Sequence, residues 1–406
     1  IAMISFEPTE DQKLITGTVS DFARTALTPR AREFEKAQAV GDEARRAVHE
    51  LGLSLAAVPE ALGGQGLGLL TAVMINEELA YGDPAAPFGL PGFGSYLIAV
   101  QELGSDDQAK ALLAPFADPA AHDLFGAVAW SERKPNRERA GFLTTAKQVS
   151  GGWELTGAKA FVGNADLAES MIVFAQVDAS AGWAGLGAFV VKKANPGLRI
   201  SGRHKTLGLE CGHFGEIALE SAKVPDADRL QGRGDFIAAT TRFFAKYALT
   251  VAARQVGLSR LAFDVSREYC DIRKAFGKPI GHFQDIAFTL ADRHMDAESA
   301  RELVRKAAWA WDSGKPDAQC LLATAQAVAH AHQVAMRCAD DAVQLHGGAG
   351  FMRDVIVEKL MRDAKQMALA GATAEQMDQL AAAVELGIPL DPALVLPTPE
   401  TQAVLT

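Results

Sequence analysis

Apolar residues in the first third of the chain recur every three or four positions, the spacing that gathers them on one face of a helix. This spacing predicts helices over residues 11–34, 42–51, 70–80 and 107–113. The run Gly63-Gly64-Gln65-Gly66 predicts a loop between two of them, and Asp83-Pro84 predicts a break after a third. We therefore expect an N-terminal helical domain over residues 1–120.

The pattern changes near residue 125, where short apolar runs replace the helical spacing. These runs cover residues 126–130, 171–175 and 186–191. Turn signals such as Ser150-Gly151-Gly152 and Asn195-Pro196-Gly197 separate them. Short runs between turns are typical of strands and hairpins, so residues 121–232 are expected to form a β domain.

Long helical patterns return after Gly234. They cover residues 236–273, 282–313, 316–345 and 354–385. Helices of this length predict a C-terminal four-helix bundle over residues 233–386. Pro389, Pro392, Pro397 and Pro399 predict an extended tail over residues 387–406. The expected fold class is mainly α with a central β domain.

Composition narrows the class of protein. The 406 residues are 49% hydrophobic and 22% charged, with a formal net charge of −10 and no long basic run, which argues against nucleic acid and anionic membranes as partners. No apolar run reaches the roughly 18 residues that a membrane span needs. The four cysteines are widely spaced without a C-x-x-C pair, so we expect no metal site, no disulfide framework and a cytoplasmic protein.

Several segments, in this order and spacing, resemble acyl-CoA dehydrogenases over nearly the whole chain. They are Val58-Pro59-Glu60, residues 63–67, 76–79, 269–280 and 283–284, Gln344-Leu345-His346-Gly347-Gly348, and residues 361–375. The resemblance implies a helical domain, a β domain and a four-helix bundle, with FAD as the cofactor.

The same resemblance implies where FAD would bind. Arg273 matches the arginine that meets the FAD pyrophosphate, a role that suits a planar and permanently charged guanidinium. Phe276 and Gln284 follow it at the family spacing. Taken alone, Arg273 equally fits an exposed arginine at a helix end.

A second flavin segment contains Gln344, Gly347 and Gly348. By resemblance, these residues approach the FAD of a neighbouring subunit, because a chain without side chains can come close to a phosphate. The alternative is a helix terminus with a glycine cap and a surface glutamine, and both interpretations can hold together.

In the β domain, Trp130 and Ser131 match residues beside the flavin ring, with Ser131 as a hydrogen-bonding hydroxyl. Phe161 stands where the family usually has tryptophan, and Gly163 stands at a position that usually carries a hydroxyl. Thr373 matches a further flavin contact. Without the resemblance, Trp130 and Phe161 are equally well explained as core aromatic residues.

The expected catalytic base is missing, because Gly371 stands where most members carry glutamate. Some relatives carry the base on the first long C-terminal helix, and that position is Tyr247 here. A phenol with a pKa near 10 is a poor base at neutral pH, so Tyr247 is a weak candidate and is better explained as a packed aromatic residue. The backbone N–H of Gly371 remains able to bind a thioester carbonyl. Candidate carboxylates to replace the base are Glu375, Asp340 and Asp341.

Other family residues are also changed, and so is the loop after Glu132, which the family uses around the CoA arm. Ala245, Ala248 and Glu210 replace an aspartate and two arginines, and a basic loop holds Arg133, Lys134, Arg137 and Arg139. These basic residues fit either CoA phosphates or a solvated surface loop. Phe88, Phe93, Tyr96 and Leu97 are candidates for lining the acyl pocket or for the core.

The resemblance implies an oxidoreductase for CH–CH groups of acyl-CoA or another acyl thioester. The expected reaction is α,β-dehydrogenation with hydride transfer to flavin N5, or a related elimination without the usual base. The alternative is a non-catalytic or flavin-sharing subunit of a hetero-oligomer. Expected partners are an electron acceptor such as an electron-transfer flavoprotein and, in the assembly, either further copies forming a dimer or tetramer or a related chain.

Overall fold

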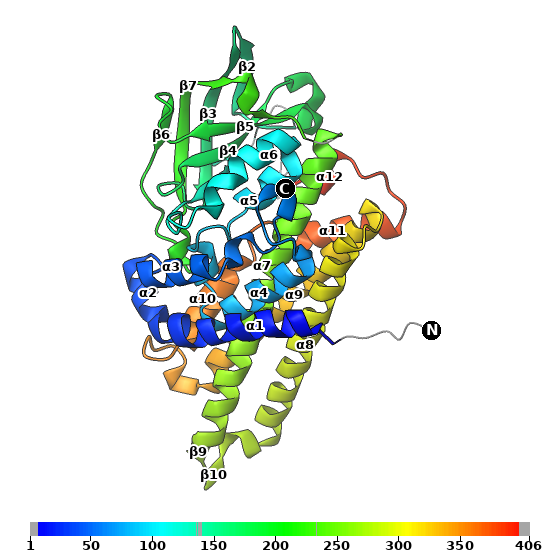
Figure 1. The fold of residues 1–406 in the computed structure, drawn as a ribbon. Coiled ribbons are helices and arrows are strands. Elements are labelled where there is room, and N and C mark those ends of the chain that lie inside the picture. The colour runs from blue at the N-terminus through cyan, green and yellow to red at the C-terminus, as the bar shows by residue number, and fades with distance from the viewer. Residues whose placement is uncertain (1–6, 135, 137–139, 233, 398–406) are drawn as a thin grey trace.

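The structure is a computed structural model that describes residues 7–134, 136, 140–232 and 234–397. Arg137 and Arg139 of the basic loop and Pro399 of the tail lie outside these residues. Figure 1 shows the β domain at one end of the molecule, helices through the middle, and a helical hairpin that extends alone at the other end. Among the described helices, none is long and apolar enough to cross a membrane.

The N-terminal region is helical, as the apolar spacing indicates. Its helices are α1 Glu10–Phe22, α2 Ala31–Ala37, α3 Asp42–Glu50, α4 Gly68–Gly82, α5 Tyr96–Leu103 and α6 Asp106–Leu113. The single helix predicted over 11–34 is wrong, because a π-helical turn and a 3-10 turn containing Pro29 separate α1 from α2. Proline lacks the N–H that a continuing helix needs. Helix α5 was not predicted.

The middle of the chain forms one eight-stranded sheet. Its strands are β1 Gly126–Ala129, β2 Thr145–Val149, β3 Gly152–Val162, β4 Ser170–Gln176, β5 Leu186–Lys192, β6 Leu198–Ile200, β7 Gly215–Pro225 and β8 Arg229–Leu230. The order is β6-β7-β3-β2-β4-β5-β8, and β1 pairs parallel to β4. The three apolar runs of the sequence correspond to β1, β4 and β5. The long antiparallel pair β3–β7 was missed, because half-exposed strands with a register shift carry no continuous apolar run.

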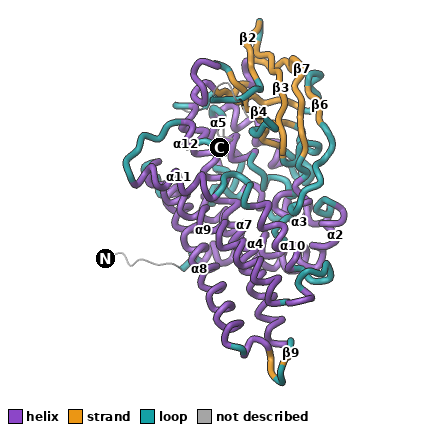
Figure 2. The backbone as a smooth tube through the Cα atoms, turned by 180° about the vertical axis from the view of Figure 1, so that it is seen from behind, coloured by secondary structure: helices purple, strands orange, loops and turns teal. Residues whose placement is uncertain are grey.

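Long helices form the C-terminal region, and Figure 2 shows them packed side by side. The long helices are α7 Phe236–Ile272, α8 Gln284–Asp312 and α9 Asp317–Leu345. The shorter helices α10 Val357–Met367 and α11 Ala374–Glu385 and the single turn α12 Pro392–Val395 follow. A two-stranded turn, β9 Lys274–Ala275 with β10 Lys278–Pro279, joins α7 to α8 at the tip of the extending hairpin (Figure 1).

Two predictions for this region are wrong. The helix predicted over 354–385 is broken, because Gly371 has a left-handed backbone with φ of 81° and Thr373 starts α11 with a capping box. The tail is not wholly extended, since Pro392 begins one helical turn in α12 and Leu396 is buried against the body of the protein. Proline is favourable in the first turn of a helix.

A buried ion cluster connects the three regions. Lys359 on α10 lies 2.6 Å from Asp83, just after α4, and 2.6 Å from Asp363, one turn further along α10. The other carboxylate oxygen of Asp363 accepts a hydrogen bond of 2.7 Å from the backbone N–H of Leu209 in the β domain. All three charged side chains are fully buried, and the two carboxylates raise the pKa of Lys359. The cluster therefore fixes the relative positions of the regions.

We expect Lys359→Met to lower the free energy of unfolding by about 3–5 kcal/mol, because it leaves two buried carboxylates without a counter-charge. Urea denaturation measures the loss. Lys13→Met is the matched control, since Lys13 pairs with Glu10 at the surface and its removal changes stability by less than about 1 kcal/mol. A Lys359→Met protein as stable as the control would contradict this role.

Candidate functional site

The loop between α10 and α11 holds Gly371, and it faces α7. A side chain built on Gly371 would place its Cβ 3.4 Å from Ala248 Cα and 3.5 Å from the ring of Tyr247, which are ordinary contact distances. The backbone N–H of Gly371 donates no hydrogen bond within the described part of the chain. A buried histidine fixes the loop, since His332 Nε2 lies 2.8 Å from the Ala372 carbonyl oxygen and its Nδ1 contacts the side-chain amide of Gln255.

The phenol beside this loop is not a base at neutral pH. Burial raises the pKa of Tyr247, and the nearby positive charge of Arg254 only partly opposes this effect. Tyr247 therefore stays protonated, and its ring occupies the space next to Gly371. This agrees with the packed-aromatic interpretation and is against the catalytic one.

The carboxylates considered as replacements are exposed or already paired. Glu375 lies in the first turn of α11 with its side chain exposed to solvent. Asp340 is also exposed, and Asp341 forms an ion pair of 2.9 Å with Arg293. Their role as a base stays a prediction.

The β domain contributes an exposed surface at the ends of β1 and β3. Ser131 is exposed, and Phe161 is 60% exposed although it is a large apolar residue. Phe161 also has a left-handed backbone with φ of 54°, an uncommon conformation for a bulky residue that often marks a functional position. A Cβ built on Gly163 would have 3.7 Å to its nearest neighbour, so the space does not require glycine there.

Trp130 does not share this exposed surface. Its ring packs among Phe142, Phe174, Trp183 and Phe244, and its Nε1 donates a hydrogen bond of 2.8 Å to the carbonyl oxygen of Pro397 in the tail. Trp130 and Ser131 follow β1, and of the two only Ser131 is exposed, so the Trp130 side chain fits the core-aromatic interpretation better than the expected cofactor contact.

A buried lysine stabilises the backbone behind Ser131. Lys159 Nζ donates to the Trp130 carbonyl oxygen at 2.9 Å and to Glu132 at 3.0 Å, and it lies 3.3 Å from the centre of the Phe142 ring. Burial lowers the pKa of Lys159 to about 7, while Glu132 opposes the shift. This arrangement fixes the strand ends that carry Ser131 and Phe161.

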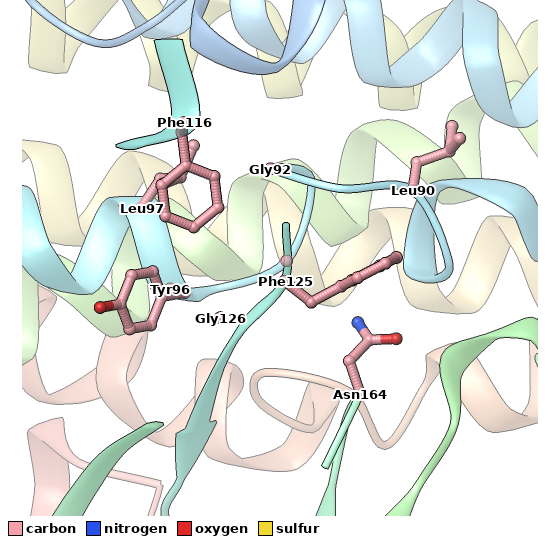
Figure 3. A pocket seen from close by; sticks show the side chains of 9 residues that line it. Leu90, Gly92, Tyr96, Leu97, Phe116, Phe125, Gly126 and Asn164 are labelled. Carbon is pink, nitrogen blue, oxygen red and sulfur yellow. The ribbon is translucent and has the colours of Figure 1, made fainter. Parts of the chain in front are cut away.

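A small pocket of about 220 Å³ lies where the N-terminal region meets the β domain. Figure 3 shows Tyr96, Leu97, Phe116, Phe125 and Asn164 around it. Asn164 follows Gly163, and its Nδ2 donates a hydrogen bond of 3.0 Å to the Phe88 carbonyl oxygen. Tyr96 and Leu97 are buried, so these two candidates line a pocket and also belong to the core.

Thr373 caps α11 two residues after Gly371, but the remaining expected cofactor residues lie at the hairpin end of the molecule. Arg273, Phe276 and Gln284 surround the tip of the α7–α8 hairpin, about 39 Å beyond Tyr247 along α7 at about 1.5 Å per residue (Figure 1). The segment with Gln344, Gly347 and Gly348 lies beside them, since His346 stacks on Tyr269 with ring centres 4.3 Å apart. One chain therefore does not bring this group together with Ser131 and Phe161.

Three family models match the chain, with the descriptions acyl-CoA dehydrogenase N-terminal domain over residues 9–119, middle domain over 127–222 and C-terminal domain over 235–385. A probable acyl-CoA dehydrogenase of Bacillus subtilis, YngJ, is 31% identical over 385 residues, covering 92% of this chain and 97% of the relative. This chain belongs to the acyl-CoA dehydrogenase family. The expected family and fold class are thereby confirmed.

Other members of the family are similar to this chain over nearly its whole length. Cyclohex-1-ene-1-carbonyl-CoA dehydrogenase of Geobacter metallireducens is 31% identical, covering 88% of this chain and 93% of the relative. The solved structure of butyryl-CoA dehydrogenase from Megasphaera elsdenii has a TM-score of 0.86 and 28% identity, with 94% of this chain and 100% of the other covered. A glutaryl-CoA dehydrogenase in complex with glutaryl-CoA has a TM-score of 0.86 and 27% identity, covering 95% and 98%.

The residues of this acyl-CoA dehydrogenase family member fit FAD, the cofactor expected from the sequence. Two exposed phenylalanines with left-handed backbones lie far apart, Phe161 on the β-domain surface and Phe276 at the hairpin tip, and Phe276 is 96% exposed. Arg273 beside Phe276 forms no ion pair with any described residue, and a Cβ on Gly347 or Gly348 would meet nothing within 4 Å. Open aromatic rings, a free guanidinium and open backbone suit a flavin dinucleotide.

We expect Gly371→Glu to raise the rate at which a saturated acyl-CoA reduces the flavin by roughly 10²- to 10⁴-fold, the usual contribution of a positioned general base. Gly371→Gln is the matched control, because both side chains carry the same strain of about 1–2 kcal/mol at a left-handed position and only glutamate is a base. Anaerobic loss of flavin absorbance measures the rate. Equal rates in the two variants would contradict the placement of Gly371 at the base position.

Proposed function

We propose that this protein is an FAD-dependent flavoprotein that acts on the α,β-carbons of an acyl thioester such as acyl-CoA. The free N–H of Gly371 carries this proposal. It lies on the loop that faces α7, where it donates to the thioester carbonyl oxygen and stabilises the negative charge that develops when the α-carbon loses its proton. When bound, FAD supplies the acceptor for the hydride of the β-carbon.

The residues that would bind and orient the flavin are identified more clearly than a residue that takes the α-proton. Ser131 and Phe161 provide a hydroxyl and an aromatic ring for the flavin, and Lys159 fixes the strand ends behind them. Tyr247 fills the space beside Gly371 and remains protonated. The proposed reaction is therefore α,β-dehydrogenation in which solvent takes the α-proton and FAD, when bound, would take the β-hydride. The variant is elimination of a β-substituent, in which solvent takes the α-proton and the substituent leaves with its bonding electron pair.

A second copy of the chain completes the flavin site in this proposal. The Arg273 group lies at the far end of α7 from Ser131, and the exposed apolar side chains Ile272, Phe276 and Phe288 lie on or next to the same hairpin tip. A surface of this kind is suited to burial against another subunit. We thus propose a closed homo-oligomer, a dimer or tetramer, in which one copy's hairpin tip meets the β-domain surface of another.

A non-catalytic subunit is a weaker alternative, since both parts of the flavin site are present in one sequence. The proposed electron acceptor is an electron-transfer flavoprotein. We also propose a cytoplasmic location, because all four cysteines are free and buried.

The first test is the visible spectrum of the protein purified alone. We expect about one FAD per chain, released on denaturation, and partial bleaching when acyl-CoA is added without oxygen. A protein that takes up no added FAD would contradict the proposal and favour a hetero-oligomer with another chain.

Subunit complementation tests the shared site. We expect Arg273→Ala and Phe161→Ala each to lower FAD binding at least about tenfold, because each removes contacts from one half-site. When the two variants are denatured and refolded together, mixed oligomers contain some sites built from two intact halves, so FAD binding returns in part. Absence of recovery in oligomers shown to be mixed would contradict the shared site. Arg267→Ala, an exposed arginine on the same helix, is the control.

A further inference from the structure

Helix α7 carries a fully buried arginine that no cofactor role explains. Arg254 is 0% exposed. Its Nε donates a hydrogen bond of 2.8 Å to Asn76 Oδ1, its Nη2 donates to the Phe93 carbonyl oxygen, and its guanidinium lies 4.5 Å from the centre of the Phe88 ring. The remaining nitrogen, Nη1, has no hydrogen-bond partner among the described residues.

No negative charge compensates Arg254 within the described part of the chain. Its two hydrogen-bond partners are neutral, and the one ionisable group that acts on it is the phenol of Tyr247. Burial lowers the pKa of Arg254 to about 10, so the side chain remains a cation at neutral pH. An unpaired buried cation is unfavourable, which makes its presence informative.

Other cations that are buried or largely buried among the described residues pair with carboxylates, as three examples show. Lys359 lies between Asp83 and Asp363, and Lys159 contacts Glu132. Arg260, less than two turns beyond Arg254 on α7, pairs with Glu77 and Glu78. Arg254 therefore differs from its neighbours in lacking an acid, although it is as deeply buried as any of them.

The position of Arg254 connects it to the candidate site. It follows Tyr247 by seven residues, two helical turns, so both side chains lie on the same face of α7, about 10 Å apart along its axis. The Tyr247 ring in turn lies 3.5 Å from the Cβ position of Gly371. Phe93, whose carbonyl contacts Arg254, stands between Gly92 and Gly94, which both line the pocket of Figure 3.

We propose that Arg254 is a specificity-determining residue that binds a carboxylate at the far end of the acyl chain, so that the preferred substrates are thioesters of dicarboxylic acids. This inference rests on the proposed function. The reacting end of the acyl group lies at Gly371, and its other end reaches along α7 past Tyr247 to Arg254. The open Nη1 offers the charge-assisted hydrogen bond that a carboxylate accepts well.

An uncharged acyl chain fits this position poorly, because it would remain beside a bare cation without neutralising it. A site built to pair a polar group discriminates against the analogue that lacks the group, since its own polar atoms are then left unpaired. The competing explanation is a structural arginine that only joins α4 and the loop at Phe93 to α7. The two explanations predict different ligand preferences.

The test compares adipoyl-CoA with hexanoyl-CoA, which have equal carbon counts and differ in the terminal carboxylate. Isothermal titration calorimetry on the FAD-loaded protein measures both affinities. We expect the native protein to bind adipoyl-CoA roughly 10- to 100-fold more tightly, the value of one or two charge-assisted hydrogen bonds. Glutaryl-CoA with pentanoyl-CoA and suberoyl-CoA with octanoyl-CoA extend the comparison to shorter and longer chains.

Arg254→Met should remove this preference or reverse it, while Arg254→Lys should keep part of it, because lysine retains the charge without the planar fork. Arg267→Met, at an exposed position of the same helix, should leave it unchanged. We also expect the ligand-free Arg254→Met protein to melt close to the native one, because removal of a buried unpaired charge offsets the loss of the hydrogen bonds to Asn76 and Phe93.

Three results would overturn the inference. Equal affinity of the native protein for both members of every pair would exclude a carboxylate subsite and leave the proposed function intact. If Arg254→Met lowers the affinity for both members of a pair equally and also lowers the melting temperature, Arg254 has a structural role only. Failure of the native protein to bind any of the six thioesters, despite normal FAD content, would overturn the proposed function together with this inference.

Discussion

The buried cluster around Lys359 is the interaction on which the site depends. It joins the end of α4, helix α10 and the β-domain backbone at Leu209, and its charged side chains are fully buried. From Leu209 the connection continues, because the carbonyl oxygen of Gly212 accepts a hydrogen bond of 2.9 Å from the Asn164 backbone N–H. Asn164 adjoins Gly163, which follows β3, the strand that carries Phe161. The ion cluster thus holds the β-domain surface in register with the helices.

The length of α7 determines how the chain can use a flavin. The helix passes Tyr247 and Ala248 opposite Gly371, continues past Arg254, and ends at Arg273 on the far tip. Residues that suit one cofactor are therefore separated by the rigid helix that connects them. This separation explains why a large exposed phenylalanine at the tip is compatible with a stable protein, since a second copy would cover it.

Two fully buried cations of this molecule have different surroundings. Lys359 stabilises the fold because its two carboxylates lie at hydrogen-bonding distance. Arg254 carries the same charge at the same depth, yet it has only neutral acceptors and an open Nη1. An unpaired buried cation is compatible with a stable fold where a bound ligand supplies the missing negative charge. For this reason Arg254, and not Lys359, suggests a ligand.

The sequence by itself determined the family, the class of fold and the absence of glutamate at Gly371, because these follow from local periodicity, turn residues and short motifs in a fixed order. It also placed Arg273 with Phe276 and Gly347 with Gly348, which are neighbours along the chain. Tertiary structure decided the rest: that Trp130 packs inward, that Glu375 is exposed and Asp341 pairs with Arg293, that α10 and α11 are separate helices, and that the two groups of expected flavin residues lie far apart. It also revealed that Arg254 is buried without an acid. The physical reason is that the face of an element, and the partner of a buried charge, depend on packing between segments far apart in sequence.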